Sequence, residues 1–389
     1  MTANSLPNSM SHSEAVDRTG AAASRRLMSV DALRGFDMFW ILGADGLVRG
    51  LDGIGQSGLT GFLGRQLTHK DWAGFAFYDL IFPLFVFIVG MSLVFSLSRT
   101  IAEQGRAAAL RRVLRRSALL FALGIFYSGG FSNEWPDIRL LGVLQRLALC
   151  YLFASLAFCF LRTRGLVVLC ASLLVGYWAL MTFVPVPGVG VGSFAKGANL
   201  ANAIDSQWLP GKKYDGSWDP EGLLSTLPAI GTCLLGVFAA LWLKRDDVSA
   251  GRKVGMLLLA GASSVALGFL WGLQFPVIKK IWTSSFVLVA GGYSALLLAV
   301  FYQVVEVWRW QRWAQPFVWI GLNPITAYLA SNIIGFRRLA TRLAGGDVKN
   351  FFNAVVAPGF GDLMISIVGL GLAFLLCWFL HRRKIYLRL

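Results

Sequence analysis

The sequence is 389 residues long, 56% hydrophobic and only 14% charged, with a mean hydropathy of +0.62. A soluble domain carries about 25% charged residues, so this composition excludes an ordinary soluble protein and predicts an integral membrane protein. The net charge of +16 would suggest nucleic-acid binding in a soluble chain. Here the basic residues cluster between apolar runs, as orientation signals do, and no nucleic-acid partner is expected.

The first part of the chain differs from the rest. Residues 1–26 are rich in Ser and Ala and contain no apolar segment of the kind that a secretory signal needs, so they are predicted to be a disordered cytoplasmic leader. Residues 27–389 are predicted to form one all-α polytopic transmembrane domain with about ten helices. These helices are expected near residues 30–49, 74–98, 112–129, 139–161, 166–184, 222–243, 254–273, 283–306, 316–335 and 363–381.

The distribution of Lys and Arg predicts the orientation of the helices. Basic residues are more frequent in one set of alternate connecting segments, including 99–116 and 382–388, than in the other set. Because cytoplasmic loops carry such an excess, both termini are predicted to be cytoplasmic. The long loop 185–221 is then extracytoplasmic. Its Trp208, Tyr214 and Trp218 either stack on a sugar or anchor an ordinary connector at the interface.

The first predicted helix is unusually charged. Asp31, Arg34, Asp37 and Asp45 share one face at 100° per residue, and charges at membrane depth must be paired or face a wet cavity. An ion pair between Asp31 and Arg34 is the structural alternative to a functional role. Asp45 has no cation one turn away and lies near the outer end, where a carboxylate could orient a catalytic histidine.

The chain contains three histidines, and two of them lie near its ends. His12 belongs to the leader and His381 to the basic tail, so His69, just before an apolar helix at the predicted outer boundary, is the candidate for proton or acyl chemistry. A solvated loop histidine is the alternative. Asp79 follows, and Pro83 should bend the helix after it. Asp79 is therefore expected either to line a cavity or to cap the start of the helix.

Polar residues also occur deep in two later helices. Arg146, beside Gln145, cannot deprotonate and needs either an acidic partner on the first helix or an anionic ligand group. Asn323 precedes Pro324, which frees backbone groups that could contact a ligand, although interhelical hydrogen bonding is the alternative. The five cysteines fall in apolar runs without metal-ligand spacing and are predicted to be buried thiols, and no metal site is expected.

Several segments of the chain together resemble the heparan-alpha-glucosaminide N-acetyltransferase family. They are RLMSVDALRGFDMF, HKDWAGFAFYDLIFPLFVFIVG, RLLGVLQRLALCYL, DPEGLLSTLPAIGTCLLGVFA and GLNPITAYL, and they extend over most of the helical body from about residue 27 to 335. The resemblance implies an acetyl-CoA-dependent transmembrane acetyltransferase. Acetyl would pass from cytosolic acetyl-CoA to an amine or hydroxyl of an extracytoplasmic amino sugar or glycan. The acceptor stays open because the outer loops differ from those of the animal enzymes.

The resemblance also implies site residues. His69 is expected to be the active-site histidine, facing outward from a bacterial inner membrane, with Asp45 as a further catalytic residue. Asp79 is predicted as a catalytic residue too, from its position at the bend of the helix. Asp45 stands where the animal enzymes have asparagine, so its role carries over by position alone. Three residues are expected to line a channel for acetyl-CoA: Arg34, Arg146 and Asn323.

Two mechanisms fit this site. His69 either removes a proton from the acceptor amine as the amine attacks the thioester, or takes the acetyl group first and passes it on. Two other classes of protein remain as alternatives, a transporter of a polar or anionic solute and a scaffold subunit with no chemistry of its own. Whether the protein forms a homodimer is open.

Overall fold

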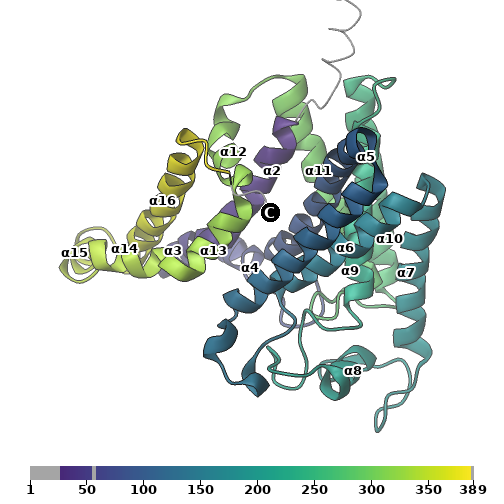
Figure 1. The fold of residues 1–389 in the computed structure, drawn as a ribbon. Helices are drawn as coiled ribbons and strands as arrows, with labels where there is room; N and C mark the ends of the chain where they lie inside the picture. Colours follow the sequence, from purple (N-terminus) through teal and green to yellow (C-terminus); the bar gives the residue numbers. More distant parts are fainter. Residues whose placement is uncertain (1–26, 55–57, 387–389) are drawn as a thin grey trace, which may run out of the picture.

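The computed structural model of the protein describes residues 27–54 and 58–386. The described part is a bundle of helices with one short hairpin (Figure 1). The helices are α2 (Met28–Phe39), α3 (Asp45–Ile54), α4 (Gly58–Gln66), α5 (Phe77–Tyr127), α6 (Val143–Phe160), α7 (Thr163–Phe183), α8 (Leu200–Trp208), α9 (Thr226–Leu243), α10 (Ala250–Gly272), α11 (Ser284–Tyr302), α12 (Gln315–Leu322), α13 (Pro324–Ile334), α14 (Phe336–Ala344), α15 (Asp347–Val355) and α16 (Phe360–Arg382). The hairpin pairs β1 (Phe194–Ala195) with β2 (Ala198–Asn199).

Within the described residues, seven helices are long and apolar enough to cross a membrane. They are α5, α6, α7, α9, α10, α11 with its continuation to Val307, and α16. Residues 312–322 and α13 pass the same test as a pair bent by 71°, which raises the number to eight. The all-α fold and its membrane-length helices match the sequence-based prediction. The predicted count of about ten and the cytoplasmic termini stay predictions.

The difference in count comes from two glycine breaks. The predicted helices 74–98 and 112–129 both fall in the 51-residue α5, which is interrupted at Gly105 (φ 82°, ψ 173°). The first predicted helix is split by a π-helical turn, Trp40–Ala44, in which Gly43 has φ 123°. Glycine reaches these backbone conformations without steric cost. Hydropathy does not reveal the break at Gly43, which lies inside a predicted helix, whereas Gly105 lies in the charged segment predicted to connect two helices.

Glycines also allow the central helices to pack backbone to backbone. A Cβ on Gly90 of α5 would lie 1.9 Å from the carbonyl oxygen of Cys233, and a Cβ on Gly236 of α9 would lie 1.9 Å from that of Phe87. Small residues permit this close approach where lipid provides no hydrophobic drive between helices. The five cysteines are free and buried, as predicted.

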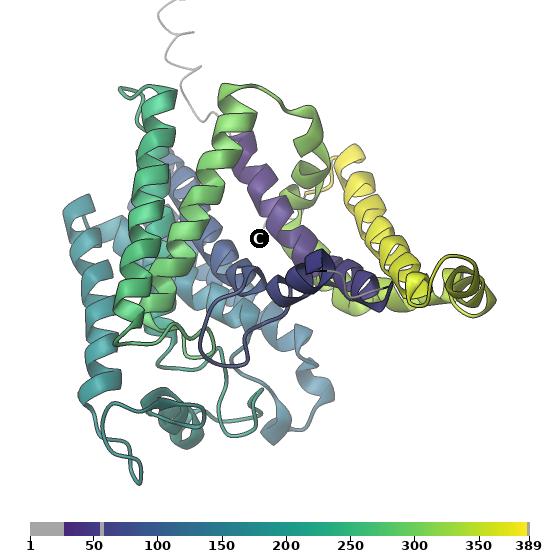
Figure 2. The ribbon, with the colours of Figure 1, turned by 180° about the vertical axis from the view of Figure 1, so that it is seen from behind.

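The helices form two flanks. One flank consists of α2, α3 and α12–α16, with α14–α16 outermost, and α7 and α10 lie at the other side in both views (Figures 1 and 2).

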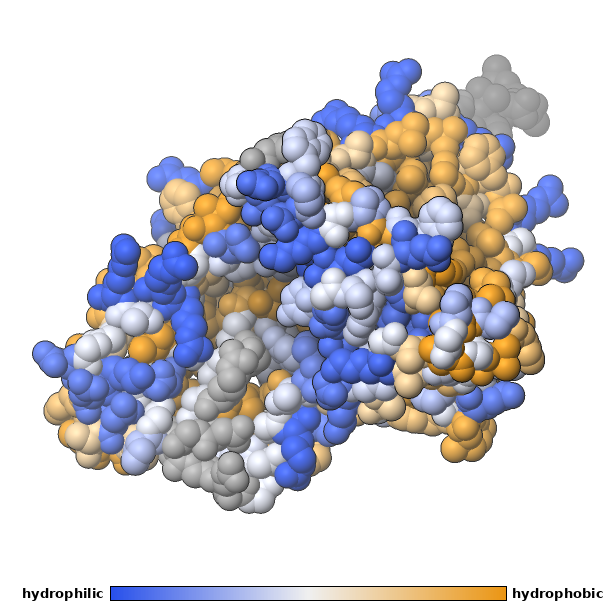
Figure 3. Space-filling model, turned by 90° about the horizontal axis from the view of Figure 1, so that it is seen from below, coloured by the Kyte–Doolittle hydropathy of each residue, from blue (hydrophilic) through white to orange (hydrophobic). Residues whose placement is uncertain are grey.

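The segment predicted as the long outer loop contains the hairpin and α8, which lies at one end of the bundle. Hydrophilic residues gather over the middle of that end (Figure 3). The carboxylate of Asp205 in α8 accepts the backbone N–H groups of Leu223 (2.8 Å) and Asp219 (3.4 Å), which folds this segment onto the start of α9.

Candidate active site

Two segments far apart in the sequence meet at the same end of the bundle as α8. The segment before α5 joins the loop between α10 and α11 through a β-bridge between Ala73 and Ile278. An adjacent backbone hydrogen bond of 2.8 Å reinforces the bridge. The first segment carries His69 and the second carries Lys279, so the bridge sets the position of one side chain relative to the other.

Asp79 holds His69 in a fixed orientation at the start of α5. Its Oδ1 lies 2.9 Å from Nδ1 of His69, and its Oδ2 accepts the backbone N–H groups of Lys70 (3.3 Å) and Ala76 (3.1 Å). The Asp79 side chain is 1% exposed, whereas that of His69 is 51% exposed. A carboxylate at Nδ1 favours the neutral tautomer protonated there, so Nε2 keeps a lone pair for a proton or an acyl group. Asp79 thus caps the start of the helix, one of its two expected roles, and it is not among the described residues that line the cavity described below.

Lys279, which was not foreseen from the sequence, joins this pair. Its Nζ lies 3.1 Å from Nδ1 and 3.4 Å from Nε2 of His69, and 3.6 Å from Oδ1 of Asp79. Burial lowers the pKa of Lys279, and the carboxylate of Asp79 opposes this shift. Lys279 and His69 are 210 positions apart. No motif or periodicity links them, so only the fold reveals the contact.

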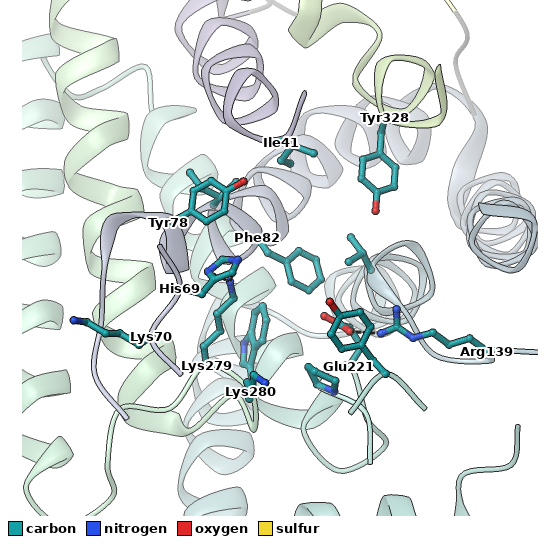
Figure 4. A pocket seen from close by; sticks show the side chains of 15 residues that line it. Ile41, His69, Lys70, Tyr78, Phe82, Arg139, Glu221, Lys279, Lys280 and Tyr328 are labelled. Atoms are coloured by element: carbon teal, nitrogen blue, oxygen red, sulfur yellow. Dashed lines mark hydrogen bonds and ion pairs between the residues drawn. The ribbon is translucent and has the colours of Figure 1, made fainter. Parts of the chain in front are cut away.

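His69 opens on a cavity of about 370 Å³ (Figure 4). His69 and Lys279 lie on one side of it, Arg139 and Glu221 lie on the other, and Tyr328 points in from α13. The remaining lining residues are Ile41, Lys70, Tyr78, Ile81, Phe82, Val143, Tyr214, Pro220, Lys280 and Trp282. The cavity therefore offers both apolar surface and polar groups, as a small-molecule site requires.

The wall opposite His69 is built on an ion-pair cluster. Arg139 donates to both carboxylate oxygens of Asp219, at 2.8 and 2.7 Å, and to Glu221 at 2.7 Å. Burial raises the pKa of Glu221, and the nearby guanidinium groups oppose this shift. The Arg139 guanidinium also lies 5.0 Å from the ring centroid of Tyr214. These contacts fix the position of the Glu221 carboxylate at the edge of the cavity.

The three aromatic residues expected either to stack on a sugar or to anchor a connector at the interface are separated in the structure. Tyr214 lines the cavity, while Trp208 is exposed elsewhere on α8. Trp218 is buried, with its ring centroid 5.7 Å from that of Trp72. Of the three, only Tyr214 can contact a ligand in this cavity.

Arg146 lies close to the site but behind its surface. It is fully buried, and its guanidinium lies 5.0 Å from the ring centroid of Trp282. It donates to the carbonyl of Gly222 and to the hydroxyl of Ser225, which lead into α9. The ion pair expected with the first helix is thus wrong for the described residues, because the acidic side chains near Arg146 belong to the outer segment instead.

The other predicted channel residues lie around the bend between α12 and α13. Arg34 pairs with Asp31 at 3.1 Å, as the structural alternative predicted, and donates to the carbonyl of Gly321 at 3.0 Å. Asn323 donates to the carbonyl of Ile385 at 3.0 Å. Neither Arg34, Asn323 nor Arg146 is among the described residues that line the cavity.

Asp45 begins α3, but its side chain lies outside the described residues. Its expected contact with His69 therefore stays a prediction. His12 lies outside the described residues too. His381 stacks on Trp319 with ring centroids 6.2 Å apart and does not line the cavity. His69 is thus the histidine that the described structure brings to this site.

Comparisons with known proteins identify the family to which the chain is similar. The family model described as heparan-alpha-glucosaminide N-acetyltransferase, catalytic, matches residues 26–270. The chain is 29% identical over 333 residues to the heparan-alpha-glucosaminide N-acetyltransferase of Homo sapiens, covering 68% of this chain and 48% of that protein. The values for the Mus musculus protein of the same name are 28% over 332 residues, with 68% and 49% covered. The chain spans about half the length of these curated relatives.

Proposed function

The chain belongs to the heparan-alpha-glucosaminide N-acetyltransferase family, and on that premise we propose that it is a transmembrane acetyltransferase. It transfers acetyl from cytosolic acetyl-CoA to an amine of an extracytoplasmic amino sugar or glycan. The observation that carries the proposal is the imidazole of His69, held at 2.9 Å by the buried carboxylate of Asp79 at the edge of a cavity. This is the arrangement that a general base or an acyl acceptor needs.

In the direct mechanism, the acceptor amine attacks the carbonyl carbon of the thioester. The new C–N bond forms as Nε2 of His69 takes the proton of the amine. The C–S bond then breaks, and the imidazolium returns the proton to the CoA thiolate. Asp79 stabilises the imidazolium between these steps, because its carboxylate lies against Nδ1.

In the alternative mechanism, Nε2 of His69 attacks the thioester itself, and CoA leaves before the acceptor reacts. The two mechanisms differ in one measurement. A burst of free CoA in the absence of acceptor would support the acetyl-imidazole, and strict dependence of CoA release on the acceptor would support direct transfer.

The two substrates approach from opposite sides of the bundle. We assign the acceptor to the end that carries His69 and α8, which faces outward from a bacterial inner membrane. The donor then enters from the other end. The 71° bend between α12 and α13, where Arg34 already contacts the carbonyl of Gly321, supports this entry, because broken helices in membranes border wet cavities. Arg34 and Asn323 would contact the donor at this bend. Arg146 would support the site from behind Trp282, against which its guanidinium packs.

The test is acetyl transfer in proteoliposomes, with labelled acetyl-CoA and a panel of amino sugars and glycan fragments. His69→Ala should lower the rate by about 10²-fold or more, because proton transfer contributes at least that much, while acetyl-CoA binding persists. His381→Ala is the matched control, since His381 stacks on Trp319 and does not line the cavity. Normal transfer by His69→Ala would remove the imidazole from the mechanism. Accumulation of labelled solute without acetyl-CoA would identify a transporter instead.

A further inference from the structure

We propose that Lys279 is a further catalytic residue, whose ammonium stabilises the oxyanion that forms on the thioester carbonyl during acetyl transfer. This inference rests on the proposed function. Acetyl transfer by either mechanism passes through a tetrahedral species with negative charge on that oxygen, and a positioned donor is often the largest single contribution to such a reaction. The site therefore needs a cation or N–H group close to Nε2 of His69.

The position of Nζ meets this need. Nζ lies at nearly equal distances from both ring nitrogens of His69, 3.1 and 3.4 Å. An atom in the ring plane at these distances would collide with Cε1, which lies between the nitrogens, so the ammonium sits over the ring face. It therefore does not block the in-plane lone pair of Nε2. A carbonyl carbon that approaches this lone pair brings its oxygen close to the ammonium.

The other cations of the cavity are engaged elsewhere. Lys280 pairs with Asp215 at 2.9 Å, and Arg139 is held by its two carboxylates. Lys70 also lines the cavity, but its side chain is exposed and extends to the side away from Arg139 and Glu221 (Figure 4). The contact of Lys279 with Asp79, at 3.6 Å, is longer than a hydrogen bond. An ammonium has three N–H groups, so this contact leaves donors for a substrate oxygen.

The backbone that carries Lys279 is tightly constrained. Trp282 has φ 51°, a left-handed conformation that costs free energy in a bulky residue and persists only when its surroundings impose it. Its side chain is buried, its indole N–H donates to Thr232 at 3.1 Å, and its backbone N–H donates to the carbonyl of Lys279 at 2.9 Å. The bridge at Ile278 ties the same turn to the segment of His69. The ammonium is thus preorganised rather than recruited from solvent.

Acetyl transfer at this site needs no oxidant, reductant or other reagent besides the two substrates. As the nucleophile bonds to the carbonyl carbon, the C=O π electrons move to the oxygen, which the Lys279 ammonium stabilises without giving up its proton. When the oxyanion collapses, the C=O bond re-forms and the C–S bond breaks, and CoA leaves as described above. Burial lowers the pKa of Lys279, because the ammonium is incompletely hydrated. The same incomplete hydration strengthens the interaction of the ammonium with an anion.

The first test compares Lys279→Met with Lys196→Met in proteoliposomes. Both variants keep most of the side-chain volume and remove one lysine charge, but Lys196 pairs with the exposed Asp71 outside the cavity lining. We expect Lys279→Met to lower kcat by about 10²-fold with little change in KM for acetyl-CoA, because the lost interaction exists only in the transition state. Lys196→Met should retain kcat within about threefold. A Lys279→Met enzyme that keeps its kcat would overturn the inference, even if His69→Ala is inactive. Failure of the unaltered protein to transfer acetyl would reject the proposed function itself.

The second test separates charge from folding. In Lys279→Cys, alkylation with 2-bromoethylamine restores an ammonium at nearly the reach of lysine, whereas iodoacetamide adds a neutral group of similar size. The five native cysteines are buried and should react slowly. We expect the ammonium adduct to regain at least about tenfold in kcat over the neutral adduct. Equal activity of the two adducts at the level of the untreated variant would show that the charge is not required and would reject the oxyanion role.

Discussion

At the scale of single residues, one buried carboxylate determines how the imidazole can act. In Asp79→Asn the amide keeps one acceptor oxygen but loses the charge that stabilises the imidazolium, and it no longer selects one tautomer. We expect kcat for acetyl transfer to fall by about 10²-fold or more, with KM for acetyl-CoA nearly unchanged. Steady-state kinetics would measure both. Asp71→Asn is the control, because its exposed carboxylate pairs with Lys196 outside the cavity lining. Wild-type kcat in Asp79→Asn would contradict this role.

The residues of this site differ in how far the sequence could predict them. His69 stood out because the other two histidines lie near the termini, and Asp79 because it precedes a proline in an apolar helix. That Asp79 contacts His69 did not follow, because the geometry of the segment between them depends on the bridge to Ile278. Lys279 was unpredictable for the same reason. A lysine in a loop between two helices carries no local signal of what it touches.

At the scale of helices, the contact between α5 and α9 gives a direct test of the packing. In Gly236→Ala the new Cβ would lie 1.9 Å from the backbone oxygen of Phe87, so the two helices must separate. We expect this to lower the free energy of unfolding in detergent by about 1–3 kcal/mol, the usual cost of overpacking. Gly176→Ala in α7 is the control, since a Cβ there meets nothing within 4 Å. Equal stability of the two variants would show that α5 and α9 pack less closely.

The helices themselves were largely predictable, because a membrane-length apolar run has no other stable structure in lipid. Their interruptions were predictable only in part. The break at Gly105 falls in the connector expected between the helices 74–98 and 112–129, whereas Gly43 looks like many other glycines and only its backbone angles distinguish it. The bend at Asn323 was partly predictable from the sequence, because Pro324 has no backbone N–H to donate to the preceding turn. The size of the bend, 71°, depends on packing against α2 and α16.

At the scale of the whole molecule, the cavity lies where the two flanks meet. Ile41 and Tyr328 belong to the flank of α2 and α13, whereas His69 and Phe82 belong to the segment before α5 and to α5 itself. The stacked rings of Tyr127 and Tyr328, with centroids 4.4 Å apart, bring the end of α5 to the same place. Both ends of α5 therefore lie at the cavity, and its break at Gly105 lies at the opposite end of the bundle.

This geometry turns the orientation inferred from basic residues into a measurable property. About 26 residues separate Asp79 from Gly105, which at 1.5 Å per residue is roughly 40 Å, enough to cross a bilayer. Trp208 of α8 and Gln104 are both exposed, and they lie at opposite ends. In sealed right-side-out vesicles, an impermeant maleimide should label Trp208→Cys at once and Gln104→Cys only after permeabilisation. The buried native cysteines keep the background low. The reverse labelling pattern would place His69 on the cytoplasmic side, where donor and acceptor would share one compartment and no transmembrane route for acetyl would be needed.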